Sequence, residues 1–456
     1  MKKFDAIIIG SGQAGTPLAF KLASEGNEVA FIEKDKFGGT CVNDGCTPTK
    51  AYVASARRIW DARNGAQLGI NIPQGATADL KKIKSRKDEI VQESVDGITS
   101  GVKEEKNITF FKGQASFTGE KKIVVNDEEL TAPEIYINTG ARAVIQEPFR
   151  NLNYLTNETI LQLEELPKHL IIMGGSYIGL EFGQMFCRFG SKVTIIEKAS
   201  SIIAHEDSEI RENILEFLQE EGIEFRLNAS CTEGMQNDDQ SVTLKLDCKE
   251  GCPEVTGSHV LIGVGRRPNT DALNLEAGEI QTDGRGYIKV NEYLETNIKG
   301  VFALGDCNGK GAFTHTSYND YEIVAANKFN SENRKVSDRI RAYNLYTDPP
   351  LGRAGMTRKE ALAEGYRLME AQMPMNKVSR AKEKGETRGM MHVIVNAENQ
   401  RILGAAILGV GGDEIISSIL QIMYADVPYT VLQQAVISHP TVSELLPTLL
   451  GGLKEV

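Results

Sequence analysis

The 456-residue chain contains one short pattern twice, and this internal repeat limits the folds that it can adopt. In each copy an apolar, largely β-branched run leads into a glycine-rich segment, and a second apolar run follows that ends in Glu-Lys. The copies are residues 5–15 (DAIIIGSGQAG) with 29–34 (VAFIEK), and 169–179 (HLIIMGGSYIG) with 193–198 (VTIIEK). Short continuous apolar runs are typical of strands in a parallel sheet that is covered on both faces. The repeat therefore predicts two βαβ units and two nucleotide-binding domains.

The first glycine segment has the spacing of a dinucleotide-binding turn. Gly10 allows the tight turn, Gly12 lets the backbone approach a pyrophosphate, and Gly15 lets the helix lie close to the strand. The N-terminus of that helix then faces the anion. Glu33 ends the next strand 23 residues after Gly10, where it can accept the ribose hydroxyls. We interpret this unit as a dinucleotide site.

The second copy keeps the spacing but changes its middle position. Gly174 and Gly179 match the first and third glycines, whereas Ser176 replaces the second. Serine is small, so a pyrophosphate can still approach. Glu197 would bond a 2′-hydroxyl and repel a 2′-phosphate, which favours NADH over NADPH, and the adjacent Lys198 keeps NADPH open.

Composition excludes several classes of function. The chain has 51 Lys and Arg against 62 Asp and Glu, a net charge of −11, which argues against nucleic acid and anionic membrane surfaces. It contains no apolar run of about 18 residues that could span a membrane, and the apolar run near its N-terminus enters a glycine motif rather than a cleavage site. Seven cysteines are too few for a secreted disulfide scaffold, so we expect a cytoplasmic protein.

The remaining sequence predicts a β insertion in each half and a third domain. Residues 76–106 have a helical pattern, 108–146 read as antiparallel strands, and 240–264 resemble a second antiparallel excursion. Asp348-Pro349-Pro350 marks a break near residue 345. Beyond it we expect a strand pair at 390–396 and 401–409 and amphipathic helices at 413–425 and 429–437. The expected domains are 1–150 and 271–340 for one nucleotide, 151–270 for the other, and 341–456 for an α+β domain.

The close cysteine pair Cys41 and Cys46 has the context of a redox-active disulfide. A regular helix places positions i and i+5 about 8.7 Å apart at Cα, whereas a disulfide needs about 4.4–6.8 Å. The pair can therefore bridge only if the first helical turn is distorted, which Gly45 makes easier. A helix N-terminus would also lower a thiol pKa. A metal site would need further ligands nearby, and the sequence around the pair offers none.

The segment GGTCVNDGCTPTK, residues 38–50, resembles the active-site signature of the class I pyridine nucleotide–disulfide oxidoreductases. Glutathione reductase, dihydrolipoamide dehydrogenase and mercuric reductase belong to that family. The resemblance extends over essentially the whole chain, through YINTGA (136–141), GGSYIGLEF (174–182), GVGRRPN (263–269), FALGDC (302–307) and SHPTVSE (438–444). It implies an α/β fold with two Rossmann-like dinucleotide-binding domains, β insertions and a C-terminal α+β dimerisation domain.

The resemblance also implies roles for individual residues. Cys41 would be the interchange thiol that meets the substrate, and Cys46 the charge-transfer thiolate against the flavin. Lys50 would lie near the flavin and pair with Glu181. Tyr177 would cover the nicotinamide pocket and swing aside for NAD(P)H. Further positions implied for FAD are Thr40, Thr139, Gly140, Asp306 and Thr314, and Gly265 is implied for NAD(P).

A histidine near the C-terminus is implied to act across a homodimer. His439 of one subunit would be the acid/base at the other subunit's site, oriented by Glu444. A histidine beside a carboxylate suits proton transfer to a leaving thiolate near neutral pH. The other five histidines have no such context, although His315 in FTHTSY could lie near the flavin.

The implied enzyme uses FAD and NADH, or NADPH, to reduce an acceptor through a Cys41–Cys46 disulfide. GCTPTK, FTHTSY and the C-terminal region are more similar to the mercuric-reductase-like branch than to glutathione reductase, which favours a soft metal ion or a disulfide as acceptor. Yet the chain lacks an N-terminal GMTCxxC domain, ends without vicinal cysteines, and retains His439. Dihydrolipoamide dehydrogenase is therefore the alternative, and glutathione reductase is less favoured because no basic pair is placed for a 2′-phosphate.

Two further classes stay open at this point. One is a flavin oxidase that works without thiols, and the other is an inactive binding module that keeps the fold. The intact cysteine signature argues against both. Cys248 and Cys252 resemble a CxxxC pair but lie in a predicted β excursion without other ligands, and we expect Cys187, Cys231 and Cys307 to be incidental.

Overall fold

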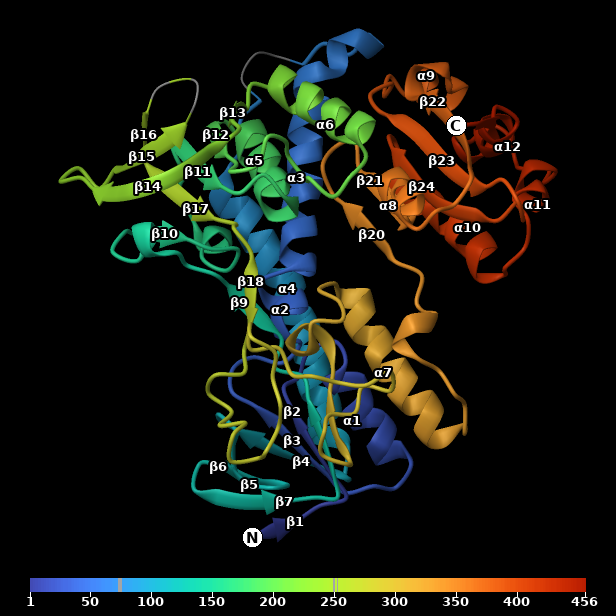
Figure 1. The fold of residues 1–456 in the computed structure, drawn as a ribbon. Coiled ribbons are helices and arrows are strands. Elements are labelled where there is room, and N and C mark those ends of the chain that lie inside the picture. The colour runs from blue at the N-terminus through green and yellow to red at the C-terminus, as the bar shows by residue number, and fades with distance from the viewer. Residues whose placement is uncertain (73–75, 249–250, 252) are drawn as a thin grey trace.

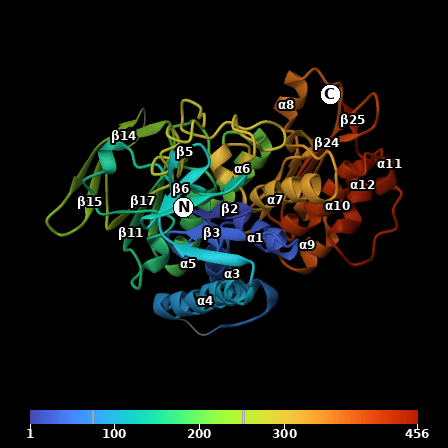
Figure 2. The ribbon, with the colours of Figure 1, turned by 90° about the horizontal axis from the view of Figure 1, so that it is seen from below.

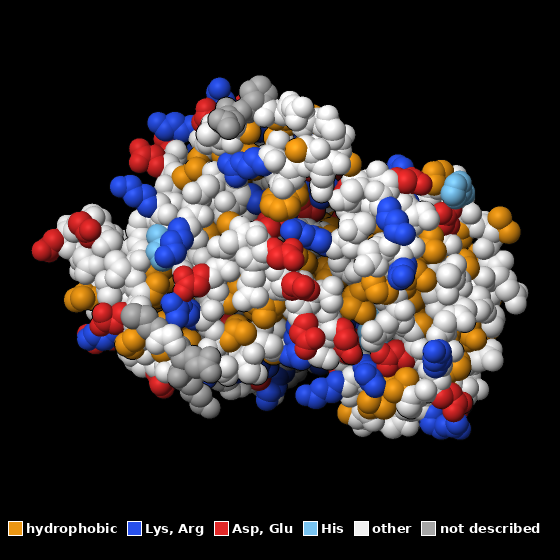
Figure 3. Space-filling model, turned by 90° about the horizontal axis from the view of Figure 1, so that it is seen from above, with side chains coloured by type: hydrophobic (Ala, Val, Ile, Leu, Met, Phe, Trp, Pro, Cys, Tyr) orange, Lys and Arg blue, Asp and Glu red, His pale blue; other side chains and the backbone are white. Residues whose placement is uncertain are grey.

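The computed structural model describes residues 1–72, 76–248, 251 and 253–456, and its three largest sheets have five, five and six strands. Figure 1 shows the first nucleotide-binding region at the bottom, the second at the upper left and the C-terminal region at the upper right. Seen from below in Figure 2, the C-terminal elements lie to one side of the two nucleotide-binding regions. On the face shown in Figure 3, acidic and basic side chains are interspersed. No helix among the described residues is both long and apolar enough to cross a membrane.

The first sheet is fully parallel and contains the first copy of the repeat. Its central strands are almost entirely buried because helices cover them, as their apolar sequences predict, whereas the edge strand at residues 108–112 buries only Ile108 and Phe111. The order is β19 (Val301–Ala303), β8 (Glu134–Ile137), β2 (Ala6–Ile9), β3 (Val29–Glu33) and β4 (Ile108–Lys112). Around it lie α1 (Gly15–Ser24), the long α4 (Leu80–Glu104) and α7 (Thr314–Phe329).

The second parallel sheet repeats this arrangement. Its order is β10 (Tyr154–Leu155), β17 (His259–Ile262), β11 (His169–Met173), β12 (Lys192–Ile196) and β13 (Glu224–Arg226), with helices α5 (Tyr177–Phe189) and α6 (Ser208–Glu220). The strand pairs β2–β3 and β11–β12 are both parallel and correspond to the two repeat copies. The predicted pair of βαβ units is therefore confirmed.

Each half carries the predicted antiparallel insertion, although its extent differs from the prediction. The first consists of β5 (Ser116–Gly119), β6 (Lys122–Val125) and β7 (Glu128–Thr131), with β1 (Lys2–Lys3) parallel at its edge. The second consists of β14 (Ala229–Gln236), β15 (Val242–Cys248) and β16 (Glu254–Gly257). The antiparallel prediction was wrong for β4, β8 and β17, which join the parallel sheets. Alternation along a strand reports which face is buried and not the direction of its neighbour.

Every described strand pairing in the third sheet is antiparallel, and the sheet contains the predicted strand pair. Its order is β20 (Ala342–Leu345), β21 (Leu351–Gly355), β24 (Ile402–Leu408), β23 (Met390–Asn396), β22 (Leu368–Pro374) and β25 (Lys454–Glu455). The turn at Asp348-Pro349 connects β20 to β21, so the predicted break near residue 345 lies inside this sheet. Its helices are α8 (Arg358–Ala363), α9 (Ser379–Glu383), α10 (Gly412–Tyr424), α11 (Thr430–Gln433) and α12 (Leu446–Leu450).

One predicted helix is shorter than expected. Residues 429–437 were predicted to be helical, but α11 ends at Gln433. Leu432 is buried in the core of this region, but Gln434, Ala435 and Val436 are exposed, and Ile437 is the next apolar side chain to pack against that core. The exposed residues add no apolar burial that would extend the short helix. By contrast, the predicted helices at 76–106 and 413–425 are confirmed as α4 and α10.

Helix α3 (Cys46–Asn64) connects the three regions. Its residues Tyr52, Ala56 and Ile59 belong to one apolar cluster with side chains of α5 and with Leu345 and Leu351 of the third sheet. The helix begins at Cys46, directly after α2 (Gly39–Asn43). The packing of α3 therefore holds the cysteine signature in place between both nucleotide-binding regions and the C-terminal one.

Candidate active site

The first glycine turn can be built only from small residues. Gly10 has a φ of +100°, and a Cβ there would lie 2.3 Å from the carbonyl oxygen of Asn138. A Cβ on Gly15 would lie 2.1 Å from the oxygen of Gly10, and one on Gly12 would lie 2.6 Å from Oδ1 of Asn138. That oxygen accepts a hydrogen bond from the amide of Gly15 at 2.9 Å. Asn138 thus fixes the start of α1 behind the turn.

The strand-ending glutamates return to the two turns. Oε2 of Glu33 accepts hydrogen bonds from the amide and hydroxyl of Ser11, at 2.8 and 2.7 Å. Oε2 of Glu197 accepts one from the amide of Gly175 at 2.7 Å. Each carboxylate therefore lies beside its glycine turn, as the repeat predicts.

The second turn has the same construction as the first. Gly174 has a φ of +105°, and a Cβ on Gly179 would lie 1.9 Å from the Gly174 oxygen. Ser176 directly precedes α5 with an extended backbone, and Tyr177 is the first residue of that helix. Gly265 has a φ of +123° and precedes β18 (Arg266–Pro268), which pairs with β9 (Ala141–Ala143).

A cavity of about 1890 Å³ runs from the first glycine turn past the cysteines to Tyr177. Most residues predicted for FAD line it, namely Gly10, Gly12, Glu33, Thr40, Thr139, Gly140, Asp306 and Thr314. Gly15 lies behind the turn. Of the residues predicted for NAD(P), Tyr177 lines this cavity. The others are not among its described lining residues, namely Gly174, Ser176, Gly179, Glu197 and Gly265.

The two signature cysteines lie on separate short elements rather than on one regular helix. Cys41 is within α2, α3 starts at Cys46, and the chain breaks its helical course at Asp44 and Gly45. A Cβ on Gly45 would lie 2.8 Å from the carbonyl oxygen of Thr40, so glycine permits this close turn. The predicted distortion between the cysteines is therefore present, and both are free thiols in this structure.

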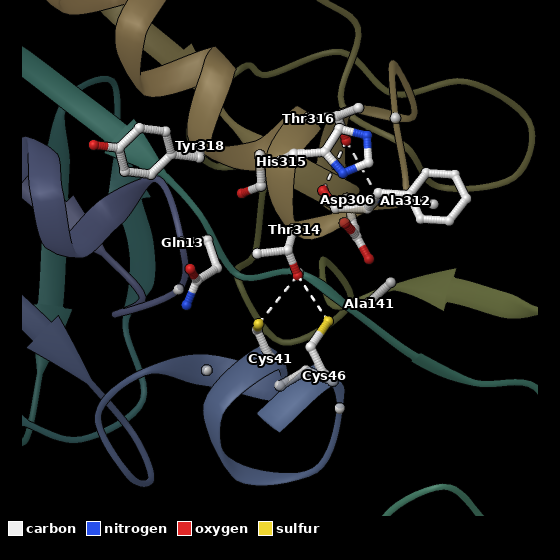
Figure 4. A pocket seen from close by; sticks show the side chains of 18 of the residues that line it. Gln13, Cys41, Cys46, Ala141, Asp306, Ala312, Thr314, His315, Thr316 and Tyr318 are labelled. Carbon is white, nitrogen blue, oxygen red and sulfur yellow. Dashed lines mark hydrogen bonds between the residues drawn. The ribbon is translucent and has the colours of Figure 1, made fainter. Parts of the chain in front are cut away.

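The hydroxyl of Thr314, at the start of α7, lies between the two sulfur atoms. Its Oγ1 is 3.1 Å from Sγ of Cys41 and 3.1 Å from Sγ of Cys46, as Figure 4 shows. A hydrogen bond from Cys41, together with Thr314 and the charge of Lys50, lowers the pKa of Cys46 to about 6. The same hydrogen bond and burial raise the pKa of Cys41. The pair is thus set up as one thiolate and one thiol.

Lys50 and Glu181 form the predicted ion pair. The Nζ of Lys50 lies 2.8 Å from Oε2 of Glu181, and Oε1 of Glu181 accepts the amide of Tyr346 at 2.9 Å. The ammonium also lies 4.4 Å from the ring centre of Tyr346. The pair joins α3 to α5 beside the cysteines, so both nucleotide-binding regions are connected at this point.

Asp306 lies at the cavity wall, in the one-turn helix that follows β19. Burial raises its pKa, and the guanidinium of Arg266, with Nε 3.7 Å from its Oδ2, opposes that rise. Figure 4 shows Asp306 on the same side of the cavity as Thr314. A buried carboxylate beside the cavity suits a ligand that brings hydroxyl groups.

His439 lies away from this cavity within a single chain. Its Nδ1 is 2.8 Å from Oε2 of Glu444, which confirms the predicted contact, but 75% of its side chain is exposed. Neither residue is among those that line the described cavity. An acid/base role for His439 therefore requires a second subunit.

Several residues that shape the site carried no recognised signal in the sequence. His205 accepts or donates a 2.5 Å hydrogen bond with the hydroxyl of Tyr177, and Phe313 and Tyr343 pack against the same tyrosine. These side chains come from three separate segments. Phe313 could have been found because it is the first residue of FTHTSY, and Asn138 because it lies inside YINTGA.

Two of the remaining cysteines have ordinary structural surroundings. Cys307 is completely buried, and the thiol of Cys187 donates to the oxygen of Glu221. Cys252 of the CxxxC pair lies outside the described residues. Within the described part of the chain, no group of three or more His, Cys, Asp or Glu side chains is arranged to hold a metal ion.

The site fits FAD. The cavity of about 1890 Å³ is lined by Gly10 and Gly12 of the first turn, and α1 begins at Gly15 at the end of that turn, as a pyrophosphate site requires. Two dinucleotide-binding units with a dithiol between them define a flavin-dependent, thiol-using oxidoreductase.

Comparison with known proteins agrees with this class. Residues 4–320 match the family described as pyridine nucleotide-disulphide oxidoreductase, and residues 342–450 match the dimerisation domain of the same family. The chain belongs to the pyridine nucleotide–disulfide oxidoreductases and is an FAD-dependent enzyme of that family. The family implies FAD and a pyridine nucleotide as cofactors.

Three curated relatives align with most of the chain. RclA of Escherichia coli (strain K12) is 34% identical over 465 residues, covering 100% of both chains. A mercuric reductase of Staphylococcus aureus is 32% identical and covers 92% of this chain and 77% of its own. A dihydrolipoyl dehydrogenase of Bacillus subtilis (strain 168) is 31% identical and covers 96% of each.

Solved structures show the same fold. The Cu(II) complex of the HOCl-induced flavoprotein disulfide reductase RclA from Escherichia coli matches with a TM-score of 0.90 and 33% identity, covering 99% of each chain. A second structure of the same RclA matches with a TM-score of 0.89, covering 98% of this chain and 99% of its own.

Proposed function

We propose that this enzyme transfers two electrons from NADH, through FAD and the Cys41–Cys46 pair, to a small disulfide or a soft metal ion. The observation that carries the proposal is the shared hydroxyl of Thr314, which lies 3.1 Å from both sulfur atoms at the cavity wall. It supports one thiolate and one thiol held ready for exchange. Gly10, Gly12 and Glu33 would hold FAD, which would supply hydride transfer from the nicotinamide and two-electron transfer to the dithiol pair.

With a disulfide acceptor, the thiols of this chain complete the reaction by exchange. The Cys41 thiol gives up its proton as its sulfur attacks the acceptor, which forms a mixed disulfide and releases the first thiolate, and that thiolate takes up the proton. The thiolate of Cys46 then attacks the Cys41 sulfur, restores the Cys41–Cys46 disulfide and releases the second thiolate, which takes a proton from solvent. The sum is NADH, one proton and a disulfide giving NAD⁺ and two thiols. The proton donor to the leaving thiolate would be His439 of the partner subunit, oriented by its Glu444.

With a soft metal ion, the same two sulfur atoms would instead serve as ligands. Thiolates prefer soft cations such as Hg(II) and copper. The named relatives support both metals as acceptors, because one relative is called a mercuric reductase and the RclA structure is a Cu(II) complex. The metal would receive the electrons as substrate and leave in a reduced state.

A second candidate is dihydrolipoamide dehydrogenase. The observation that favours it is the His439–Glu444 contact at 2.8 Å, because reversible thiol–disulfide exchange needs an acid/base whereas metal reduction does not. The similarity to a dihydrolipoyl dehydrogenase at 31% identity supports the same candidate. The carboxylate of Glu197 beside the second turn favours NADH in either case.

The test is an acceptor panel with the purified holoenzyme. Steady-state oxidation of NADH and of NADPH would be followed with lipoamide, glutathione disulfide, Hg(II) and Cu(II), and repeated with Cys46→Ser. We expect one acceptor to give a kcat/KM well above the others and to lose it in the variant. Equal turnover of wild type and Cys46→Ser with every acceptor would contradict the proposal.

A further inference from the structure

Tyr177 lies in a cluster of aromatic rings at the end of the cavity that is distant from the first glycine turn. Its ring centre is 5.4 Å from that of His205, 5.8 Å from Phe313 and 5.6 Å from Tyr343. The four residues come from the start of α5, the segment before α6, the residue before α7, and β20. The tyrosine is therefore surrounded by groups from both nucleotide-binding regions and from the third sheet.

Two of these rings form a fixed wall. Phe313 stacks on Tyr343 with a centroid distance of 5.6 Å and an interplanar angle of 10°. The hydroxyl of Tyr343 donates to Glu206, and Oε2 of Glu206 is 3.0 Å from Nε of Arg353, which is 1% exposed. Because Tyr343 is tied to a buried ion pair, this wall cannot follow Tyr177 when that ring moves.

The Tyr177 hydroxyl forms a short hydrogen bond with His205, and the side chain of Tyr343 also bonds to it. The Oη of Tyr177 lies 2.5 Å from Nε2 of His205. Burial lowers the pKa of His205 and raises that of Tyr177, so both groups are neutral near pH 7. A neutral imidazole and a phenol make one hydrogen bond, whichever of the two donates.

We propose that His205 is a positioning residue, which holds Tyr177 closed over the nicotinamide subsite by bonding its hydroxyl. This inference rests on the proposed function, because it assigns the ring of Tyr177 to the nicotinamide subsite. A nicotinamide that displaces Tyr177 must first break the bond to His205. The apparent dissociation constant for NADH is then the intrinsic one divided by the fraction of molecules in which the ring is open.

Two substitutions of His205 separate its hydrogen bond from its bulk. His205→Phe keeps a ring in contact with Tyr177 but removes both nitrogens, whereas His205→Gln keeps an amide that can bond the hydroxyl. In anaerobic stopped-flow reduction of the holoenzyme, we expect His205→Phe to lower the apparent Kd for NADH roughly 2- to 10-fold, the range of one hydrogen bond. The limiting rate of flavin reduction should stay the same, and His205→Gln should behave as wild type.

A matched control variant and a double-mutant cycle of His205 with Tyr177 test whether the hydrogen bond between them sets the Kd for NADH. His259→Phe removes a half-buried histidine of the same region that does not line the cavity, and it should leave the Kd unchanged. Tyr177→Phe should reproduce the effect of His205→Phe, and the double variant should add nothing further. Additive effects, or an unchanged Kd in His205→Phe, would overturn the inference.

A readout that does not depend on turnover separates this inference from the proposed function. A 3-fluorotyrosine placed at position 177 reports the environment of the ring by its ¹⁹F resonance. His205→Phe should shift that resonance toward its position in the NAD⁺-saturated wild type, and His205→Gln should not. If NADH fails to reduce the wild-type flavin, the proposed function fails, and an unchanged resonance in His205→Phe would by itself refute the role of His205.

Discussion

Lys50 and Glu181 face each other at 2.8 Å across the boundary between α3 and α5. They are 131 residues apart in the chain, one beside the cysteine signature and the other in the second repeat. Their charges act on the Cys46 thiolate in opposite directions, since Lys50 lowers its pKa and Glu181 raises it. The ion pair is thus part of the electrostatics of the dithiol as well as a structural link.

Single neutralisations of this pair should move the pKa of Cys46 in opposite directions. Lys50→Met removes the stabilising cation and should raise it from about 6, whereas Glu181→Gln should lower it further. The pH dependence of iodoacetamide alkylation of the reduced enzyme, resolved at Cys46 by mass spectrometry, measures both. Shifts of the same sign in the two variants would show that repacking, not charge, decides the effect.

The thiolate of Cys46 should set the pH dependence of alkylation in the wild type. A thiol whose pKa is lowered to about 6 is ionised above that pH and protonated below it, so its reactivity should fall as the pH drops through 6. Cys41, whose pKa is raised, should be alkylated only at much higher pH. A single common midpoint for both cysteines would argue against an asymmetric pair.

Thr314→Val should destabilise the Cys46 thiolate, and so raise the pKa of Cys46, while keeping the shape of the side chain. The variant loses the hydroxyl that lies 3.1 Å from both sulfur atoms. One hydrogen bond to a charged group is worth about 1.5–3 kcal/mol, so alkylation of Cys46 at pH 6 should slow roughly tenfold. Thr314→Ser restores the hydroxyl and should recover the wild-type rate. If the Val variant reacts like wild type, the Thr314 hydroxyl does not stabilise the Cys46 thiolate.

The glycines of the repeat make a prediction about stability. Gly179→Ala places a Cβ 1.9 Å from a backbone oxygen and should destabilise the fold by roughly 1–3 kcal/mol. Gly97→Ala is the matched control, because Gly97 lies in α4 with nothing within 4 Å, and it should stabilise by roughly 0.5–1 kcal/mol. Urea unfolding midpoints compare the two. Equal midpoints would show that the tight turn relaxes.

His439 should act at the site of the other subunit. His439→Gln should slow reduction of a disulfide acceptor roughly 10²- to 10⁴-fold and leave reduction by NADH unchanged. Heterodimers of His439→Gln with Cys46→Ser contain one site with intact cysteines facing an intact His439. They should regain activity, as measured on tagged, purified heterodimers. Inactive heterodimers would place His439 at the site of its own chain.

The sequence predicts the repeated units well because their chemistry is local. A glycine turn, an apolar strand and a terminal glutamate lie within one short stretch, so Glu33 and Glu197 were placed correctly beside their turns. The cysteine pair was also expected to need a distorted helix, and Gly45 supplies that break.

Contacts between distant segments could not be predicted from the sequence in this way. His205, Phe313 and Tyr343 meet Tyr177 only because three regions of the chain converge, and no spacing in the sequence encodes that meeting. The parallel pairing of β4 and β8 depends likewise on partners elsewhere in the chain. The predicted domain ranges remain predictions.

The most direct test of the account is an anaerobic titration of the purified, flavin-loaded enzyme with NADH, followed by visible absorption. If electrons pass through Cys41 and Cys46, one equivalent of NADH per subunit should produce a long-wavelength band from the Cys46 thiolate beside the flavin, and Cys41→Ser should show such a band before any NADH is added. Bleaching of the flavin without that band in the wild type would contradict the thiol relay.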